Sequence, residues 1–205
     1  MLAALNLEEF LNETASSSPV PGGGSVAALC ACIAASLSEM VAGLTIGKKG
    51  FEAVEEEMIG MAGRASELRK RLMKDIDRDA DAYKAVMTAY RLPRGEDTEK
   101  KKRAAAIEKA LKNAAMVPLE VARAAFELID LAGIAVQKGN PNAVTDGAVG
   151  AMTARTAVLA ALYNVKINLS AIKDNAFIES VSREVERLET EIVKKEQRIF
   201  ALVKL

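Results

Sequence analysis

The sequence Ser-Ser-Ser-Pro-Val-Pro-Gly-Gly-Gly-Ser occupies residues 16–25 and leads directly into a small, apolar stretch at residues 26–46. Each proline disfavours helical backbone in the residue before it, so a helix is expected to begin only after them. Three consecutive glycines permit positive φ angles and let another group approach the main chain closely. The stretch therefore predicts a tight turn that opens a buried helix.

The unpaired backbone N–H groups at such a helix start could bind an anionic or carbonyl-bearing ligand. A simple turn into a core helix is the alternative, and the commoner role of a glycine run. The stretch lacks the Gly-Lys-Ser/Thr ending of a P-loop and no strand precedes it, which also excludes a dinucleotide fingerprint. The candidate ligand-binding residues here are Pro21, Gly22, Gly23, Gly24 and Ser25.

The composition is typical of a helical protein with a substantial core. A chain of 205 residues suits one domain, which we expect to span residues 1–205. Lys plus Arg and Asp plus Glu both number 28, so nothing indicates a nucleic-acid or membrane partner. Aromatic residues make up only 4% and alanine is abundant, which favours closely packed helices over sheets.

The sequence contains no histidine, so any acid–base chemistry must use Asp, Glu, Lys, Tyr or Cys. A histidine metal site is excluded. Cys30 and Cys32 are two residues apart on a predicted helix and point in different directions, so they cannot bridge or chelate together. No metal or other cofactor is expected. Because no signal peptide is evident, the expected location is the cytoplasm.

Apolar residues recur at steps of three and four, which is the period of amphipathic helices. Helices are predicted at residues 26–46 and 51–92, from Asp97 to near Lys138, after Asp146, and from about Asp174 onward. No segment alternates like a strand. The predicted fold is all-α, an antiparallel multi-helix bundle with long helices.

Two predicted helices carry stripes of small residues and are expected to pack on one another or on copies in a partner subunit. Residues 26–46 are long enough to span a bilayer, but Ser36, Ser38 and Glu39 interrupt them, so a buried helix of a soluble protein is favoured. A heptad seam over residues 178–202 offers another adhesive face. These faces exceed what one bundle needs, which predicts a homodimer or higher oligomer.

Four aspartates, Asp75, Asp77, Asp79 and Asp81, cluster late in the 51–92 helix. Most such charges are solvated. Asp79 differs because it occupies a position on the apolar stripe, where a carboxylate is costly unless it is paired or used. Asp79 is therefore a candidate functional group, and its neighbours are weaker candidates.

Each of five further polar residues has two possible interpretations. Lys48 could be only a helix-end cation, and Asn140 and Asp146 could be turn residues. Asn164 and Asn168 are separated by one helical turn among apolar residues, so they could bind a ligand or cap neighbouring backbone.

Several of these segments together resemble the signature of the cyclodeaminase/cyclohydrolase family. That family comprises the cyclodeaminase half of formiminotransferase-cyclodeaminase and stand-alone bacterial methenyltetrahydrofolate cyclohydrolases. The matching segments occur in the family's order, at residues 18–28 and 40–49, Asp77-Arg78-Asp79-Ala80 with Leu92-Pro93, residues 139–146 and residues 164–169.

The resemblance implies an all-helical, dimer-forming domain that binds tetrahydrofolate carrying a one-carbon unit, without a metal or redox cofactor. It does not tell the two reactions apart, and since no formiminotransferase module precedes the domain, the stand-alone type is favoured. Both reactions pass through a tetrahedral carbon flanked by nitrogens and need a proton shuttle. Asp79 is the expected acid–base group, with Asp77 or Lys48 assisting.

In the same interpretation, the glycine loop and helix start at residues 21–25 hold the pterin or the glutamate tail of the folate. Asn140, Asp146, Asn164 and Asn168 bind its polar edges. The competing hypothesis is a non-catalytic helical assembly module whose heptad seam is the interface. Thermal melting with and without folate derivatives separates the two, because only a specific ligand raises the melting point.

Overall fold

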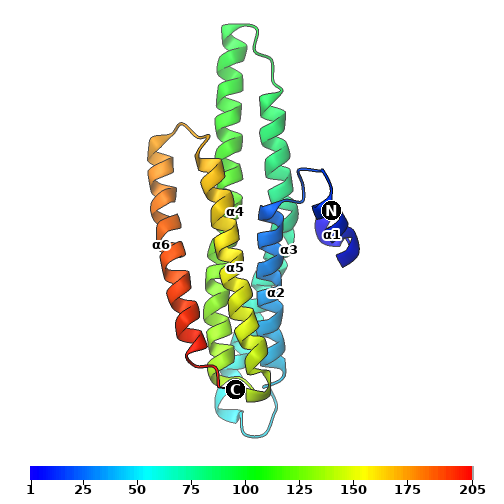
Figure 1. The fold of residues 1–205 in the computed structure, drawn as a ribbon, viewed down its shortest axis with the longest axis vertical. Helices are drawn as coiled ribbons and strands as arrows, with labels where there is room; N and C mark the ends of the chain where they lie inside the picture. The colour runs from blue at the N-terminus through cyan, green and yellow to red at the C-terminus, as the bar shows by residue number, and fades with distance from the viewer. Residues whose placement is uncertain (205) are drawn as a thin grey trace.

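The computed structural model describes residues 1–204, which form six α-helices and no strand (Figure 1). The helices are α1 (Leu7–Ala15), α2 (Gly23–Gly43), α3 (Glu55–Tyr90), α4 (Asp97–Lys138), α5 (Val144–Leu169) and α6 (Asn175–Phe200), and 3-10 turns lie at Leu2–Ala4, Glu52–Val54 and Pro141–Ala143. The predicted all-α, antiparallel bundle is confirmed.

The long helices α2 to α5 pack side by side, and α6 lies against α4 and α5 (Figure 1). Helix α1 lies at the side of the bundle, near the start of α2, and its Phe10 is buried in the core. The end of α3 and the start of α4 project beyond the other helices as a hairpin. The start of α2 therefore lies part-way along the bundle, beside the later half of α3 and the end of α5.

Small side chains allow α2 and α5 to approach closely. Both predicted stripes are buried, and they consist of Ala27, Ala31, Ala34 and Ser38 on α2 and Gly147, Gly150, Ala154, Ala157 and Ala161 on α5. A Cβ added at Gly150 would lie 3.6 Å from the Cβ of Leu37 on α2. The two striped helices thus pack on one another within the chain, and close packing of this kind dominates the core.

The heptad seam of α6 is also used inside the chain. Its buried members are Val181, Val185, Leu188, Ile192 and Ile199. Lys195, which interrupts the seam, forms an ion pair with Asp130 of α4 and lies 4.6 Å from the centre of the Phe126 ring. The seam is therefore occupied by the bundle, which removes the interface on which the assembly-module hypothesis depended.

The long helices begin and end close to the predicted residues. Asn6 and Glu9 form a reciprocal cap at the start of α1, and Glu96 caps α4, which begins at Asp97 as predicted. Helix α2 begins at Gly23, earlier than the predicted residue 26, with Gly22 as its N-cap. None of the three glycines at 22–24 has a positive φ, so they are needed for their missing side chains and not for unusual backbone angles.

Two segments, Gly23–Gly43 and Pro141–Leu169, are long and apolar enough to cross a membrane by length and composition, and half of the apolar stretch of each is buried inside the bundle. Core helices of soluble proteins meet the same criterion. Here the packing of α2 and α5 on the rest of the bundle accounts for their apolar character.

Candidate active site

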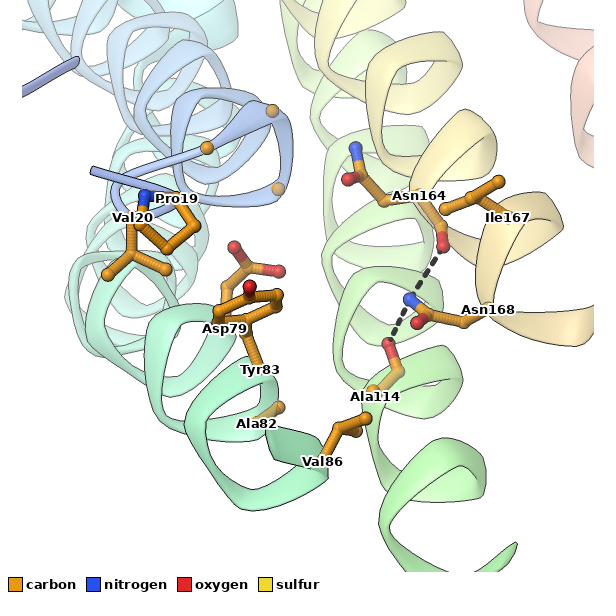
Figure 2. A pocket seen from close by; sticks show the side chains of 13 residues that line it. Pro19, Val20, Asp79, Ala82, Tyr83, Val86, Ala114, Asn164, Ile167 and Asn168 are labelled. Carbon is orange, nitrogen blue, oxygen red and sulfur yellow. Dashed lines mark hydrogen bonds between the residues drawn. The ribbon is translucent and has the colours of Figure 1, made fainter. Parts of the chain in front are cut away.

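A cavity of about 340 Å³ lies where the start of α2, the later half of α3, the middle of α4 and the end of α5 meet (Figure 2). Its volume is within the range of small-molecule sites. Its walls are formed by Pro19, Val20, Gly22, Gly23, Gly24, Asp79, Ala82, Tyr83, Val86, Ala114, Asn164, Ile167 and Asn168. Asp79 is the single charged residue of this lining, which contains no lysine or arginine.

The carboxylate of Asp79 lies against the first turn of α2. The hydroxyl of Ser25 is 3.2 Å from Asp79 Oδ2, and the backbone N–H of Ser25 also hydrogen-bonds to this carboxylate. A Cβ added at Gly24 would lie 2.0 Å from Asp79 Oδ1. Only glycine at position 24 leaves room for the carboxylate at the positive end of the helix dipole.

Burial raises the pKa of Asp79 above its usual value, and the hydrogen bonds from Ser25 partly oppose this shift. Within residues 1–204, no lysine or arginine forms an ion pair with Asp79, so no cation cancels the effect of burial. The site therefore holds a carboxyl group that takes up a proton more readily than an exposed aspartate, as expected of an acid–base catalyst.

Ser25 hydrogen-bonds to Asp79 and does not line the cavity. Its side chain is fully buried, and its hydroxyl oxygen lies 2.9 Å from the carbonyl oxygen of Ile76 as well as 3.2 Å from Asp79 Oδ2. A hydroxyl has one proton, so it donates to Asp79 when that group is ionised. When Asp79 is protonated, the same hydroxyl can donate to Ile76 and accept from the acid. Both protonation states of Asp79 are thus satisfied.

Two amides face Asp79 from the opposite wall (Figure 2). The side-chain N–H₂ of Asn164 donates to the Ala160 carbonyl at 2.9 Å. The side-chain N–H₂ of Asn168 donates to the carbonyl oxygens of Ala114 and Asn164, at 2.9 and 2.8 Å. These bonds fix the amide planes and leave the side-chain oxygens as acceptors for a ligand.

The apolar part of the wall was not identified as functional from the sequence. It consists of Ala82, Tyr83, Val86, Ala114 and Ile167. Tyr83 follows Asp79 by one helical turn, and its ring lies in front of the carboxylate (Figure 2). That spacing was a usable signal, whereas nothing in the sequence distinguishes Ala114 from the many other alanines.

Of the remaining predicted site residues, Asp77 and Pro21 lie near the cavity without lining it. Asp77 accepts hydrogen bonds from the backbone N–H groups of Leu2, at 2.5 Å, and Ala3, at 3.4 Å. It therefore fastens the N-terminal 3-10 turn to α3. Pro21 is buried, whereas Val20 and Gly22 on either side of it are half-buried.

Lys48, Asn140 and Asp146 lie at the other end of the bundle. Asn140 donates from its backbone N–H to the Thr45 hydroxyl at 2.9 Å and from its side chain to the Leu44 carbonyl at 3.0 Å. Lys48 follows the C-terminal end of α2, whose 21 residues span about 30 Å from the cavity. Within one chain, these three residues do not contribute to the cavity that contains Asp79.

The fully buried carboxylate of α3 is Asp75, and its position was not distinguished in the sequence. Arg78 Nη1 lies 2.5 Å from Asp75 Oδ1, and Arg71 lies 3.9 Å from the other oxygen. Glu120 of α4 shares both arginines. This network joins α3 to α4, so the burial of Asp75 has a structural explanation that Asp79 lacks.

Among residues 1–204, no three His, Cys, Asp or Glu side chains gather in a group that could hold a metal ion. The fold and the cavity together define an all-helical protein with a small-molecule site, in which one unpaired carboxyl group faces amides and an apolar wall.

Comparison with known proteins identifies the family. The profile of formiminotransferase-cyclodeaminase matches residues 6–187. Methenyltetrahydrofolate cyclohydrolase of Methylorubrum extorquens is 41% identical over 97% of this chain and 95% of its own length. The rat formimidoyltransferase-cyclodeaminase is 32% identical over 89% of the chain, which spans 34% of that longer protein.

A solved structure agrees. The crystal structure of formiminotetrahydrofolate cyclodeaminase from Thermotoga maritima superposes with a TM-score of 0.89 at 32% identity, covering 99% of this chain and 98% of that one. The chain belongs to the formiminotransferase-cyclodeaminase family, and the expected resemblance is confirmed.

Proposed function

We propose that the chain is a methenyltetrahydrofolate cyclohydrolase, which adds water to the one-carbon bridge of 5,10-methenyltetrahydrofolate. As a member of this family it is an enzyme of tetrahydrofolate one-carbon chemistry. The cyclohydrolase of M. extorquens supports this choice, since it shares 41% identity against 32% for the T. maritima cyclodeaminase. Formimidoyltetrahydrofolate cyclodeaminase is the second candidate, because that structural match covers both chains almost completely.

The observation that carries the proposal is the unpaired carboxyl group of Asp79 in a cavity without cations. The methenyl bridge of the substrate is a delocalised amidinium cation. An ionised Asp79 beside the bridge stabilises its positive charge. It also lowers the free energy of the charged transition state in which water adds to the bridge carbon. Binding of the cation also favours the ionised form of Asp79, which is the form that accepts a proton.

In the proposed mechanism, a water oxygen bonds to the bridge carbon while Asp79 takes one of its protons. The resulting carbon carries a hydroxyl group between two nitrogens. Asp79 then returns the proton to N5 as the bond from the carbon to N5 breaks. The hydroxyl group loses its remaining proton to solvent and becomes the carbonyl of 10-formyltetrahydrofolate, so the reaction releases one proton overall. The sequence is redox-neutral and needs no metal or organic cofactor, and the Ser25 hydroxyl accommodates both protonation states of Asp79.

The wall of the cavity suits a flat heterocycle with polar edges. Tyr83, Val86 and Ile167 provide apolar surface on which the pterin can lie, with the Tyr83 ring beside Asp79. The side-chain oxygens of Asn164 and Asn168 can accept hydrogen bonds from pterin N–H groups.

The proposed function predicts that the purified protein removes the near-ultraviolet absorption of 5,10-methenyltetrahydrofolate far faster than buffer alone. Formiminotetrahydrofolate is expected to remain unchanged, with no ammonia released. Ammonia release would reassign the chain as a cyclodeaminase. Inactivity on both compounds, together with an unchanged melting point in their presence, would instead support a non-catalytic assembly role.

We also propose that the protein is a cytoplasmic homodimer that associates through the exposed side of α2 and α5, the pair of helices nearest the viewer in Figure 1. The two free thiols are consistent with a reducing compartment. We call this surface the α2/α5 face. Its exposed and half-buried members are Val26, Leu29, Ile33, Leu37, Met40 and Leu44 of α2, with Val149, Met152, Thr156, Ala160, Tyr163 and Ile167 of α5.

The α2/α5 face has the size and chemistry of a subunit interface. It carries no charged side chain over a length of about 30 Å and a width of about two helices, or roughly 600 Å². An apolar patch of that size is at the upper end of what monomers expose. Two copies of it would bury roughly 1,200 Å² in total, which reaches the range of stable dimers.

Replacement of Met152 by glutamate is expected to produce a monomer, because a carboxylate would be buried without a partner at the centre of the interface. A penalty of about 3 kcal/mol raises the dissociation constant more than about a hundredfold. Light scattering at micromolar concentration measures the result. Ile59→Glu is the matched control, since Ile59 is 55% exposed on α3 outside this face. A dimer that tolerates Met152→Glu but not Ile59→Glu would place the interface elsewhere.

A further inference from the structure

The cavity of a single chain lacks a partner for the anionic end of its substrate. Tetrahydrofolate derivatives carry a glutamate tail with two or more carboxylates, whereas Asp79 is the single charged residue of the lining. Anions in protein sites are normally held by lysine, arginine or backbone N–H groups. Because the first turn of α2 already holds Asp79, the tail needs cations that this chain does not place at its own cavity.

Unpaired cations occur in the turn that follows α2. Lys48 and Lys49 are exposed and form no ion pair with any residue in the range 1–204. Gly47 and Gly50, which flank them, have φ values of 70° and 94° and make the turn tight. Both lysines lie about 30 Å or more from the cavity of their own chain, beyond the reach of any side chain.

The register of α2 and α5 shows what a two-fold related copy would bring to the cavity. A Cβ at Gly23 would lie 3.2 Å from Asn164, and one at Gly150 would lie 3.6 Å from Leu37, so these pairs are level along the bundle. The middle of the α2/α5 face is therefore near Ile33. Ile167 belongs both to this face and to the cavity lining, so the face continues into the rim of the cavity.

Face-to-face dimers with two-fold symmetry can align α2 with its copy in two ways. The parallel arrangement places both Lys48–Lys49 turns side by side, which brings four like charges together. The antiparallel arrangement opposes the helix dipoles favourably. About an axis near Ile33, it also places the partner's Lys48 opposite Pro19 and Val20, at the outer rim of the cavity.

We propose that the active site is composite, with the partner's Lys48 and the partner's Lys49 binding the carboxylates of the substrate tail at the cavity of the first chain. This inference rests on the proposed function and on the antiparallel dimer. Charge complementarity supports it, because the substrate tail is anionic, the cavity lining has no cation, and the lysine pair lacks an anion within one chain. It also gives Lys48, predicted from the sequence as a site residue, a role that its own cavity cannot provide.

Loss of both lysines is expected to lower kcat/KM about tenfold to a thousandfold, through KM more than kcat, because two charge-assisted contacts to the tail are removed. The matched control is Lys109→Ala, an exposed lysine on α4 outside the cavity, which should leave kcat/KM unchanged. On a methenyl substrate without the glutamate, the Lys48→Ala/Lys49→Ala variant and the wild type should be equal. A lysine variant with wild-type kcat/KM on the complete substrate would overturn the proposal.

The decisive test is complementation in a heterodimer. One chain carries Asp79→Asn and the other carries Lys48→Ala/Lys49→Ala, and two different tags allow the mixed dimer to be purified. One of its two sites then contains an intact Asp79 with intact lysines of the partner, so about half of wild-type kcat/KM is expected. The control pairs Asp79→Asn with Asn164→Ala, two defects in the same cavity, and its kcat/KM should not exceed the mean of its two parent homodimers. A first heterodimer with kcat/KM no higher than the mean of its own parents would show that the lysines do not act across the dimer.

A geometric measurement keeps the test independent of the reaction. In a Cys30→Ala background, Lys48→Cys combined with Val20→Cys should be joined between chains by a bismaleimide of about 10 Å, because the two positions are too far apart within one chain. Lys48→Cys combined with Lys109→Cys should not be joined. If the wild type were inactive on methenyltetrahydrofolate, the proposed function would fail while this result still decided the arrangement of the chains. Absence of the cross-link between chains in a proven dimer would contradict the composite site.

Discussion

Replacement of Asp79 by asparagine is expected to lower kcat by about 100- to 10,000-fold, the usual contribution of a positioned acid–base group. Asparagine retains the shape and can still bond to Ser25, but it cannot transfer a proton. KM should change less than kcat, although loss of the negative charge beside the amidinium weakens binding somewhat. Steady-state kinetics with 5,10-methenyltetrahydrofolate measures both constants. Turnover close to that of the wild type would mean that the proton passes through another group.

Two neighbouring aspartates provide matched controls. Asp81→Asn removes an exposed carboxylate, 3.3 Å from Lys84, and should leave kcat unchanged. Asp77→Asn should loosen the N-terminal 3-10 turn, which depends on Asp77 for two backbone hydrogen bonds, and lower the melting point without a comparable fall in kcat. A larger kcat effect for Asp77→Asn than for Asp79→Asn would move the proton transfer to Asp77.

The dependence of stability on pH gives a second readout for Asp79. Its pKa is raised in the folded protein, so folding favours the protonated form. The contribution of Asp79 to the free energy of unfolding is fully present below the pKa that this group has in the unfolded chain. It is lost as the pH rises through the pKa of Asp79 in the folded protein. Asp79→Asn should therefore melt higher than the wild type at neutral pH, and the difference should shrink as pH falls below about 4. In kcat/KM, the acidic limb of the wild-type profile should lie above the ordinary aspartate range.

The fold could be predicted because local signals and tertiary structure agree. The three- and four-residue apolar period located the long helices to within a few residues of their ends. Pro118 shows the limit of such rules. A proline in a helix interior removes one hydrogen bond and often ends the helix, yet α4 continues through Pro118 and buries it, since tertiary packing outweighs that loss.

The site could be predicted only in part because it is assembled from four separated segments. The glycine run, Asp79, Asn164 and Asn168 do meet in one cavity. Of the two reasons given for the glycines, close approach of another group is supported, since Gly24 leaves room for Asp79, whereas none of the three adopts a positive φ angle. Apolar position along a helix also failed to separate Asp75 from Asp79. Asp75 is paired with Arg71 and Arg78 of its own helix, at spacings of four and three residues, and this spacing was a usable signal. Glu120 of α4, which shares both arginines, could not be found from the pattern of one helix.

The contact between Gly24 and Asp79 leads to the second large expected effect. Gly24→Ala should reduce kcat nearly as much as Asp79→Asn while the fold survives. The new Cβ would lie 2.0 Å from Asp79 Oδ1, so the carboxylate must leave the first turn of α2. A shift of about 1 Å in a catalytic group can lower the rate about a hundredfold. The backbone itself is not strained, because residue 24 lies within a regular helix.

Gly63→Ala is the matched control for this substitution. A Cβ at this exposed position of α3 would have nothing within 4 Å, so activity should be unchanged and stability should rise by about 0.5–1 kcal/mol. A second comparison uses Gly23→Ala, which would crowd Asn164 at 3.2 Å and should affect KM more than kcat.

The double variant Gly24→Ala/Asp79→Asn decides whether Gly24 acts through the carboxylate. If the glycine matters only because it leaves room for an ionisable Asp79, removing the carboxylate removes its importance, and the double variant should be no slower than Asp79→Asn alone. Such non-additivity is the signature of residues that work as a unit. Rate losses that multiply would show that Gly24 acts independently of Asp79, through direct contact of the α2 backbone with the substrate. Measurement of kcat for the two single variants and the double variant, with circular dichroism to confirm the fold, completes the cycle.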